Sequence, residues 1–426
     1  MNTKKFNNIF FIFVSFIILI AIFNLYQKHL VGNDSTMSEW FINYQGGFTR
    51  RGLIGEICFK IADLFNLKLR FVIFIFQSVI ITIYLILIYQ FIKDLPKNIL
   101  TVIAIFSPLF LLYPVAEIEV LARKEIFIFI GFIIFLNLSN VKTNNNYSFV
   151  YIFIVFPILC LIWEPVIFFT PFIIYVFLIK NNQDSLTKVS IKILIALSTS
   201  IAVCIYIILN LLTPEEHTIM SNSLMDRFGE ICYMSCSLLT SKGTITNQFN
   251  DVYNLLKLYN GPTALFRYSL IILIGFLPLL ILLYYSRLKS KILLLNVFKK
   301  LHIHIIILLL PTIIMFASMT DWGRIVNMMY VFSILLSLYL IKNDLINTND
   351  KVLYFDNFFR INKKIFITIF IVFAFGWNPK TSILGDVATN SLYKIIYNTS
   401  KKVFNFDGIR LFENSTIIKL HNKYIE

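Results

Sequence analysis

Four short polar clusters interrupt an otherwise apolar chain, and they contain the residue types that could do chemistry. Their charged members are Arg50, Arg51, Arg123, Lys124, Glu125, Glu164, Asp321 and Arg324. An arginine stays charged, and its planar guanidinium can bind two phosphate oxygens at once. A carboxylate within hydrogen-bond reach of a hydroxyl can remove its proton when the pKa of the carboxylate suits the task. Together these groups favour a reaction in which a diphosphate leaves and a hydroxyl attacks.

The charged residues fall into two candidate roles. The candidate catalytic carboxylates are Glu164, Asp321 and Asp34. The candidate ligands of the diphosphate are Arg50, Arg51, Arg123, Lys124, Arg324 and Arg227. We expect no metal and no cofactor, because the chain has no Walker motif, no G-x-S-x-G, no HExxH and no zinc spacing. Cations alone would then stabilise the charge on the leaving group.

Structural roles compete with these chemical ones. The two adjacent arginines of the first cluster also suit anionic lipid headgroups. Arg123 and Lys124 follow two nearby glutamates and could belong to an ordinary surface ion-pair cluster. Asp321 lies three residues before Arg324, which is the spacing of a simple helical salt bridge. Glu164 is harder to explain structurally, because a carboxylate in a tight turn between two apolar runs has few structural uses.

The composition identifies an integral membrane protein made of helices. Of the 426 residues, 58% are hydrophobic and only 14% are charged, and the mean hydropathy is +0.77. Apolar runs long enough to cross a bilayer as helices recur along the chain. They predict an all-α, polytopic bundle of about eleven spans in a single integral membrane domain, residues 1–426. The predicted spans are 8–27, 70–92, 98–115, 124–139, 148–163, 165–180, 191–212, 264–286, 303–319, 325–342 and 364–378.

The distribution of basic residues predicts which face each connection occupies. Basic connections that are poor in acids alternate with the others, so the positive-inside rule places them in the cytoplasm together with the N-terminus. The net charge of +15 is therefore mainly a topology signal, and we expect no nucleic-acid partner. The outer face would carry the loop 28–69, the large loop 213–263 and the tail 379–426. All four polar clusters would also lie on that face.

The first outer loop is predicted to contain an interfacial helix from Gly52 to Asn66. Its apolar side would carry Leu53, Ile57, Ile61 and Leu64. The same loop contains Asp34 and Glu39 just beyond the first span. Either carboxylate could act as a general base, although the sequence favours an exposed loop carboxylate.

Two cysteines lie in the large outer loop. Cys232 and Cys236 could form a disulfide if that loop faces an oxidising compartment, and the sequence leaves both the disulfide and the free thiols open. A metal site is disfavoured, because His217 is the only histidine of that loop.

Three classes of function fit a membrane protein with polar clusters on one face. A glycosyltransferase or polymerase would use polyprenyl-linked sugars at that face. A transporter should show charged or broken helices near mid-membrane and an internal repeat, and neither is visible. A structural or assembly subunit would explain the spans but not the clusters. The one-sided charges therefore favour an enzyme.

The chain resembles the bacterial Wzy-type polymerases of O-antigen and capsule repeat units. The resemblance is in length, in the many Phe and Ile residues, in the long outer loop 213–263 and in the arginines on outer loops, without a diagnostic motif. It implies a fold like that of GT-C-type membrane glycosyltransferases in the bacterial inner membrane, with the site facing the periplasm. It further implies inverting, metal-independent transfer of an undecaprenyl-diphosphate-linked glycan onto the next lipid-linked repeat.

The resemblance also indicates partners and alternatives. The expected partners are a lipid-linked donor and acceptor, the lipid bilayer and a chain-length regulator protein. The alternative enzyme adds a single sugar from a polyprenyl-phosphate donor, with its base near Asp34. The alternative of another class is a flippase for lipid-linked glycans.

Overall fold

Helices form almost all of the regular structure. The computed structural model describes residues 3–31, 35–95, 98–141, 143, 146–181, 184–239, 245–258, 261–289, 300–348, 357–358, 361–382, 388–389, 392 and 395–396. The helices up to the large loop are α1 (Thr3–Val31), α2 (Ser35–Ser38), η1 (Glu39–Phe41), α3 (Gly52–Leu64), α4 (Leu69–Ile92), α5 (Ile99–Ile105), α6 (Tyr113–Ala116), α7 (Glu125–Leu138), α8 (Tyr147–Val150), η2 (Tyr151–Val155), α9 (Phe156–Ile162), η3 (Glu164–Phe169), α10 (Thr170–Lys180) and α11 (Leu186–Leu209). The later elements are α12 (Pro214–Phe228), η4 (Ser237–Leu239), α13 (Ile245–Leu258), α14 (Gly261–Tyr284), α16 (Leu301–Leu309), η5 (Leu310–Thr312), α17 (Ile313–Ser318), α18 (Trp322–Lys342), α20 (Lys363–Phe375) and the strands β1 (Ser286–Leu288), β2 (Ile346–Thr348), β3 (Asn378–Pro379) and β4 (Ala388–Thr389).

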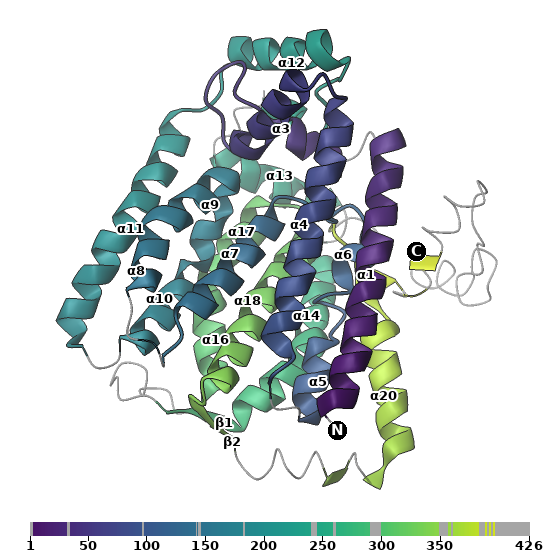
Figure 1. Ribbon diagram of the computed structural model, residues 1–426, viewed down its shortest axis with the longest axis vertical. Helices are drawn as coiled ribbons and strands as arrows, with labels where there is room; N and C mark the ends of the chain where they lie inside the picture. The colour runs from purple at the N-terminus through teal and green to yellow at the C-terminus, as the bar shows by residue number, and fades with distance from the viewer. Residues whose placement is uncertain are drawn as a thin grey trace.

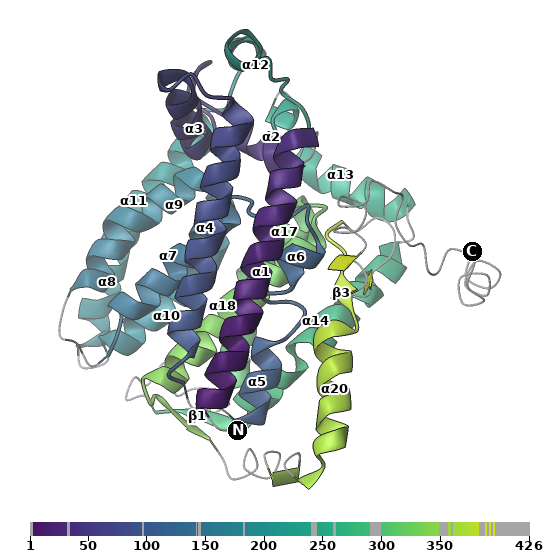
Figure 2. The same ribbon diagram turned by 45° about the vertical axis from the view of Figure 1, so that its right-hand side comes forward.

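The protein is a multi-pass helical membrane protein. Within the described residues, six helical segments are long and apolar enough to cross a bilayer, namely α1, α4, α11, α14, the run α16–η5–α17, and α18. Helix α18 lies in the middle of the bundle (Figures 1 and 2), and 89% of its most apolar 18-residue stretch is buried. The other five segments keep larger parts of their apolar surface exposed, as expected of helices that face lipid.

Several predicted spans are shorter or less regular than the sequence indicates. The predicted span 98–115 is interrupted, because α5 ends at Ile105 and the chain is not helical around Pro108 before α6 begins. The predicted spans 148–163 and 165–180 contain the π-helical turn η2 and the 3₁₀ turn η3. A count of eleven spans therefore stays a prediction, whereas the all-helical, multi-pass class is confirmed.

Helix α3 begins at Gly52 as predicted, and the side that it packs against the protein is not its most apolar side. Leu64 and Ile57 of the predicted apolar side are exposed. The opposite side, including Ile54 and Cys58, is buried against the protein. The hydrophobic pattern predicted the apolar side but not which side packs on the protein, because hydrophobicity cannot show which side has the shape to approach a neighbour. The exposed apolar side keeps the character expected of a helix at a membrane interface.

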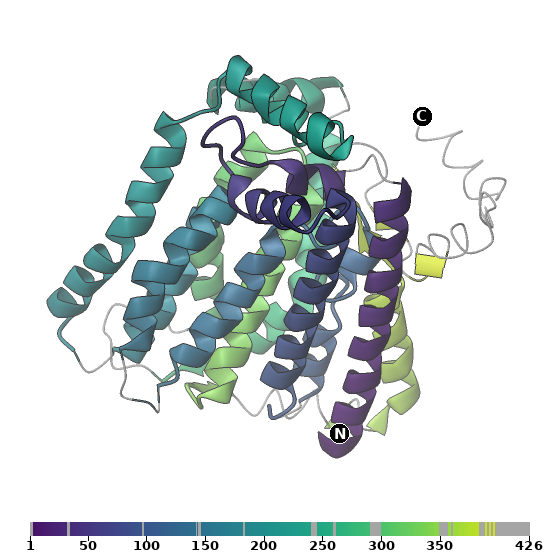
Figure 3. The same cartoon turned by 45° about the horizontal axis from the view of Figure 1, so that its top comes forward.

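The two ends of the bundle differ. Helices α3 and α12 lie at one end, and the N-terminus and the β1–β2 pair lie at the other (Figures 1 and 2). Helix α12 runs across the bundle end above α3 (Figure 3). The region 213–263, predicted only as a large loop, contains the two helices α12 and α13. The end that carries α3 also carries the polar clusters.

Candidate functional site

A buried carboxylate, Glu39, joins three arginines from three separate parts of the chain. Its side chain is completely buried in the short turn η1. The Nε of Arg123 donates a hydrogen bond to Glu39 Oε2 at 2.9 Å. A guanidinium nitrogen of Arg51 lies 3.7 Å from Glu39 Oε1, and one of Arg324 lies 3.9 Å from the same oxygen. Glu39 is therefore the anionic centre around which the cations assemble.

Arg51 also pairs with the carboxylate of Glu164 in a two-point contact. Arg51 donates from Nε to Oε2 at 2.9 Å and from a terminal nitrogen to Oε1 at 2.8 Å. Its backbone has a φ of +63°, a left-handed conformation that is rare for a residue with a side chain. The Nζ of Lys124 donates to the carbonyl oxygen of Arg51 and so stabilises this turn. The strained backbone directs the Arg51 side chain into the cluster, as is common at functional sites.

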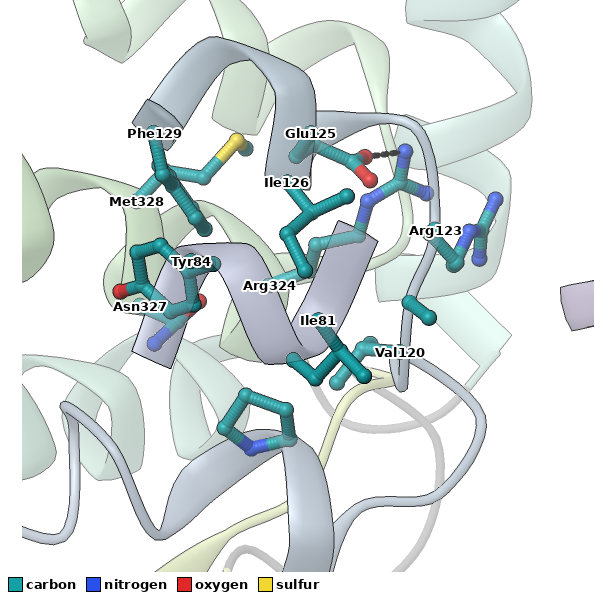
Figure 4. A pocket seen from close by; sticks show the side chains of 12 residues that line it. Ile81, Tyr84, Val120, Arg123, Glu125, Ile126, Phe129, Arg324, Asn327 and Met328 are labelled. Atoms are coloured by element: carbon teal, nitrogen blue, oxygen red, sulfur yellow. Dashed lines mark ion pairs between the residues drawn. The ribbon is translucent and has the colours of Figure 1, made fainter. Parts of the chain in front are cut away.

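Arg324, at the start of α18, contacts two further carboxylates. It forms an ion pair with Glu125 (Figure 4) and a hydrogen bond of 3.1 Å to Oδ2 of Asp321. A terminal nitrogen of Arg123 lies 3.5 Å from the same Asp321 oxygen. The Arg324 guanidinium carbon lies 5.9 Å from the centre of the Trp163 ring. Asp321 therefore contacts two arginines, while Arg324 is enclosed by carboxylates and an aromatic ring.

We call this set the buried ion-pair cluster. Its members are Glu39, Arg51, Arg123, Lys124, Glu125, Glu164, Asp321 and Arg324. The four cations and four carboxylates balance in charge, which is what allows charges to be buried at moderate cost. Arg50 lies next to the cluster, is half-buried and forms no ion pair within the described residues, although the charge of Glu164 acts on it. Arg50 is therefore the guanidinium most available to an incoming anion.

The carboxylates of the cluster differ in basicity. Burial alone would raise the pKa of Glu39, but the charges of Arg123 and its neighbours outweigh it and hold the pKa well below the usual range. The pKa of Glu164 is also lowered, because Arg51 outweighs the effect of burial. The pKa of Asp321 is raised, because there burial outweighs the attraction of Arg123. With one-third of its side chain exposed, Asp321 is the carboxylate that combines access with basicity.

The cations also respond to burial. Burial lowers the pKa of Lys124 to about 8, despite the opposing charge of Glu39. For Arg51, burial would lower the pKa, but Glu164 outweighs it and the pKa is raised. Arg51 is thus fixed in its charged form.

A small cavity borders the cluster on the side of the bundle interior. It has a volume of about 30 Å³ and lies between α4, α7 and α18. Arg123, Glu125 and Arg324 form its polar wall, with Tyr84 and Phe129 among the residues opposite (Figure 4). It has room for about two water molecules, since one water needs roughly 10–15 Å³. A sugar or diphosphate does not fit in this cavity.

Close packing of α3 on the turn after η1 holds Glu39 in place. A Cβ added to Gly55 would lie 1.9 Å from the carbonyl oxygen of Ile42 and 2.6 Å from that of Trp40. No side chain larger than hydrogen fits at that contact. This close approach also explains why the Gly55 side of α3 faces inward.

Replacing Gly55 with alanine should move α3 away from η1 and lower the melting temperature of the detergent-solubilised protein by several degrees. Gly229→Ala measures backbone strain without crowding, because Gly229 has a φ of +66° and nothing within 4 Å of an added Cβ. It should cost only the backbone strain of about 1–2 kcal/mol. Equal melting temperatures for the Gly55 variant and the wild type would show that this contact does not matter.

Replacing Glu39 with glutamine should destabilise the protein strongly, because it leaves three arginines facing a neutral group. Removal of one partner from a buried ion pair typically costs about 3–5 kcal/mol. The expected result is a large fall in the melting temperature of the purified protein. Asp63→Asn removes a carboxylate from an exposed ion pair on α3 and should change little. A Glu39 variant as stable as the Asp63 variant would contradict the central role of Glu39.

The structure brings together most of the predicted site residues. Six of them lie in the buried ion-pair cluster, namely Arg51, Arg123, Lys124, Glu164, Asp321 and Arg324. Arg50 lies beside it. Arg227 does not join it, since it lies on α12, is 65% exposed and pairs with Asp63 at 3.5 Å. Asp34 lies outside the described residues.

Two carboxylates of the cluster were not predicted as site residues. The sequence offers Glu39 as a possible base or an exposed loop carboxylate, whereas the structure buries it completely, and it places Glu125 only as the neighbour of Lys124. The available signal was charge balance, because four cations buried in an apolar chain require a similar number of anions. Their assignment to particular cations depends on contacts across the fold.

The large-loop cysteines form a disulfide. Cys232 and Cys236 are bonded, with Cα atoms 5.3 Å apart, and His217 lies beside them. These three residues are the group of potential metal ligands found within the described part of the chain. The sulfur atoms are occupied by their mutual bond, so a metal would require the reduced pair. No family model, curated protein or solved structure matches the chain.

Proposed function

We propose that this protein is a GT-C-type membrane glycosyltransferase of about eleven spans that polymerises undecaprenyl-diphosphate-linked repeat units into O-antigen or capsular polysaccharide. It acts at the outer face of the bacterial inner membrane, with its N-terminus in the cytoplasm and its site facing the periplasm. Its partners are a lipid-linked donor and acceptor, and a chain-length regulator. The observation that carries this proposal is the buried ion-pair cluster at one end of a helical membrane bundle, which contains a partly exposed, basic carboxylate, Asp321. Arg50 lies beside this cluster and forms no ion pair within the described residues.

Each group of the cluster has a role in this reaction. Asp321 accepts the proton of the acceptor hydroxyl, whose oxygen attacks the anomeric carbon of the donor. The glycosidic bond to the diphosphate breaks, and the diphosphate leaves with the electron pair. Arg50 and Arg51 stabilise the charge that develops on it. A single displacement of this kind inverts the anomeric centre.

The remaining members hold these groups in position. Glu164 fixes the Arg51 guanidinium through two hydrogen bonds, and Glu39 gathers three arginines around one carboxylate. Arg123 and Arg324 hold Asp321 from two sides. A site on the membrane boundary lets the lipid tails remain in the bilayer during the reaction. The disulfide supports the outer placement of this end, because disulfides persist in oxidising compartments.

The transferase that adds a single sugar is the second candidate. The same base and the same cations would serve it. Arg50, which forms no ion pair in the described part of the chain, suits a monophosphate at least as well as a diphosphate. A flippase is less well supported, because the described charges of the cluster gather at one end of the bundle rather than near its middle.

The gel pattern of cell-surface polysaccharide tests the proposal in a host that lacks the gene. Loss of a long ladder, leaving core plus one repeat, would support a polymerase when the wild-type gene restores the ladder. A shorter or altered single repeat would instead support the single-sugar transferase. An unchanged ladder would exclude the polymerase. Accumulation of complete lipid-linked repeats on the cytoplasmic side would identify a flippase.

A further inference from the structure

The disulfide loop contacts the turn that carries Glu39. The backbone N–H of Ser235 donates to Ser38 Oγ at 3.3 Å. The ring of Tyr233 packs edge-on against Phe41, with ring centres 5.9 Å apart. Ser38 directly precedes η1, and Phe41 ends it. The residues between the two cysteines therefore contact η1 at both of its ends.

Phe41 has a second contact, with Arg70, whose guanidinium pairs with Glu230 just upstream of the disulfide. Glu230 pairs with Nε of Arg70 at 2.7 Å, and the Arg70 guanidinium carbon lies 5.7 Å from the centre of the Phe41 ring. Phe41 is thus contacted by the ring of Tyr233, within the disulfide loop, and by the guanidinium of Arg70, which pairs with Glu230 two residues before Cys232. The conformation of this loop and the position of Glu39 are mechanically connected.

The two cysteines differ in access, and a histidine lies against them. Cys232 is half-buried, whereas Cys236 is fully buried. His217 Nε2 lies 3.4 Å from Cys232 Sγ and 3.2 Å from the carbonyl oxygen of Cys236. An imidazole N–H at this distance stabilises a thiolate on Cys232. This arrangement places an imidazole beside the sulfur of Cys232, the less buried of the two residues, and leaves the sulfur of Cys236 able to close the bond again.

We propose that Cys232 and Cys236 form a thiol–disulfide exchange site for a dithiol reductant, and that its reduction loosens the turn holding Glu39. One thiolate of the reductant attacks Cys232 Sγ, the S–S bond breaks, and Cys236 leaves as the thiolate. The second thiol of the reductant then attacks the mixed disulfide and releases Cys232. The net change is two protein thiols and one disulfide in the reductant.

The short span of the bond fits a local role. Cys232 and Cys236 are four residues apart, so the bond closes a very short loop and restricts the unfolded chain less than a long-range disulfide would. Its main effect falls on the shape of the loop itself. The consequence for catalysis rests on the proposed function, because it acts through Glu39 on the arginines of the buried ion-pair cluster.

Reactivity of single cysteines tests the exchange site without an activity assay. In the purified full-length protein, Cys232 of a Cys236→Ser variant should react with iodoacetamide at least tenfold faster than Cys236 of a Cys232→Ser variant, measured peptide by peptide with mass spectrometry. Adding His217→Gln to the Cys236→Ser variant should slow the reaction of Cys232 several-fold at neutral pH. Equal rates for the two cysteines, or free thiols at both positions in untreated wild type, would overturn the proposal.

Hydrogen exchange tests the mechanical connection. Reduction of the wild type with dithiothreitol should speed amide exchange in residues 35–41 at least tenfold while leaving α7 unchanged. Unchanged exchange in residues 35–41 after complete reduction would overturn the connection to Glu39. The Cys232→Ser/Cys236→Ser double variant should show the fast exchange with or without reductant.

Polymer synthesis by the purified protein separates this inference from the proposed function. A dithiol should lower the rate at least tenfold in the wild type and have no effect on the double variant. Fast amide exchange in residues 35–41 together with an unchanged rate of polymer synthesis would overturn the regulatory effect but not the proposed polymerase activity. Absence of polymer in both redox states would count against the polymerase, while the alkylation rates would still decide the exchange site.

Discussion

Replacing Arg51 with alanine is expected to abolish the polysaccharide ladder of cells that depend on this gene. The variant removes the two hydrogen bonds to Glu164 and one of the three arginines around Glu39. It also removes a cation from the developing charge on the leaving group. Loss of a single stabilising donor of this kind typically lowers the rate about 10²–10³-fold. The ladder on a gel and the rate of polymer synthesis in membranes measure the effect.

Two further substitutions separate a chemical role of Arg51 from a structural one. Arg51→Lys keeps the charge but not the two-point contact, so it should restore only part of the ladder. Arg227→Ala removes an exposed arginine at the same end of the protein, on α12, and should leave the ladder unchanged. The amount of each variant in the membrane is the control for folding. A normal ladder from a normal amount of the Arg51→Ala protein would remove Arg51 from the site.

Replacing Asp321 with asparagine is expected to lower kcat about 10²–10⁴-fold, because it removes the group that accepts the proton of the acceptor hydroxyl. KM should change much less, because asparagine can still accept hydrogen bonds from Arg123 and Arg324. Single-turnover measurements with a lipid-linked donor and acceptor would distinguish loss of chemistry from loss of binding. A rise in KM with an unchanged kcat would instead make Asp321 a binding residue.

The dependence of the rate on pH provides an independent test of Asp321. A base acts in its deprotonated form, so activity should fall as the pH falls through the pKa of Asp321. Burial raises that pKa above the ordinary value of 3.8, so the acidic limb should lie above that of an exposed aspartate. The limb should disappear from the residual activity of the Asp321→Asn variant. Asp63→Asn should keep the limb unchanged, and a limb that persists without Asp321 would identify another base.

Much of the site composition was predictable from the sequence, because charges are costly in an apolar chain. Four polar clusters in a membrane protein had to lie at membrane boundaries or in a shared cavity, and their charged residues do meet. The partners were not predictable. Arg51 pairs with Glu164 across 113 positions, and Arg123 pairs with Glu39 across 84. Spacing along one helix predicts a contact between neighbours such as Asp321 and Arg324, but it gives no information about contacts between helices.

The packed side of α3 illustrates the same limit. Its hydrophobic pattern identified the apolar side with Leu64 but not the side that packs on the protein, which is the side with Gly55. In a membrane protein, apolar side chains are stable against lipid, so hydrophobicity does not distinguish the lipid-facing side from the protein-facing side. Small residues that allow close approach decide the contact instead. At Gly55, an added Cβ would lie only 1.9 Å from the carbonyl oxygen of Ile42.

The sequence by itself determined that this protein is a helical, multi-pass membrane protein, because long apolar runs can satisfy their backbone hydrogen bonds in a bilayer as helices. It also determined which charged residue types are present at the helix ends. Only the tertiary structure decided which charges pair and which carboxylate stays basic. The reason is physical: the pKa of Glu39 falls and that of Asp321 rises through burial and neighbouring charges, and both depend on segments that the fold brings together.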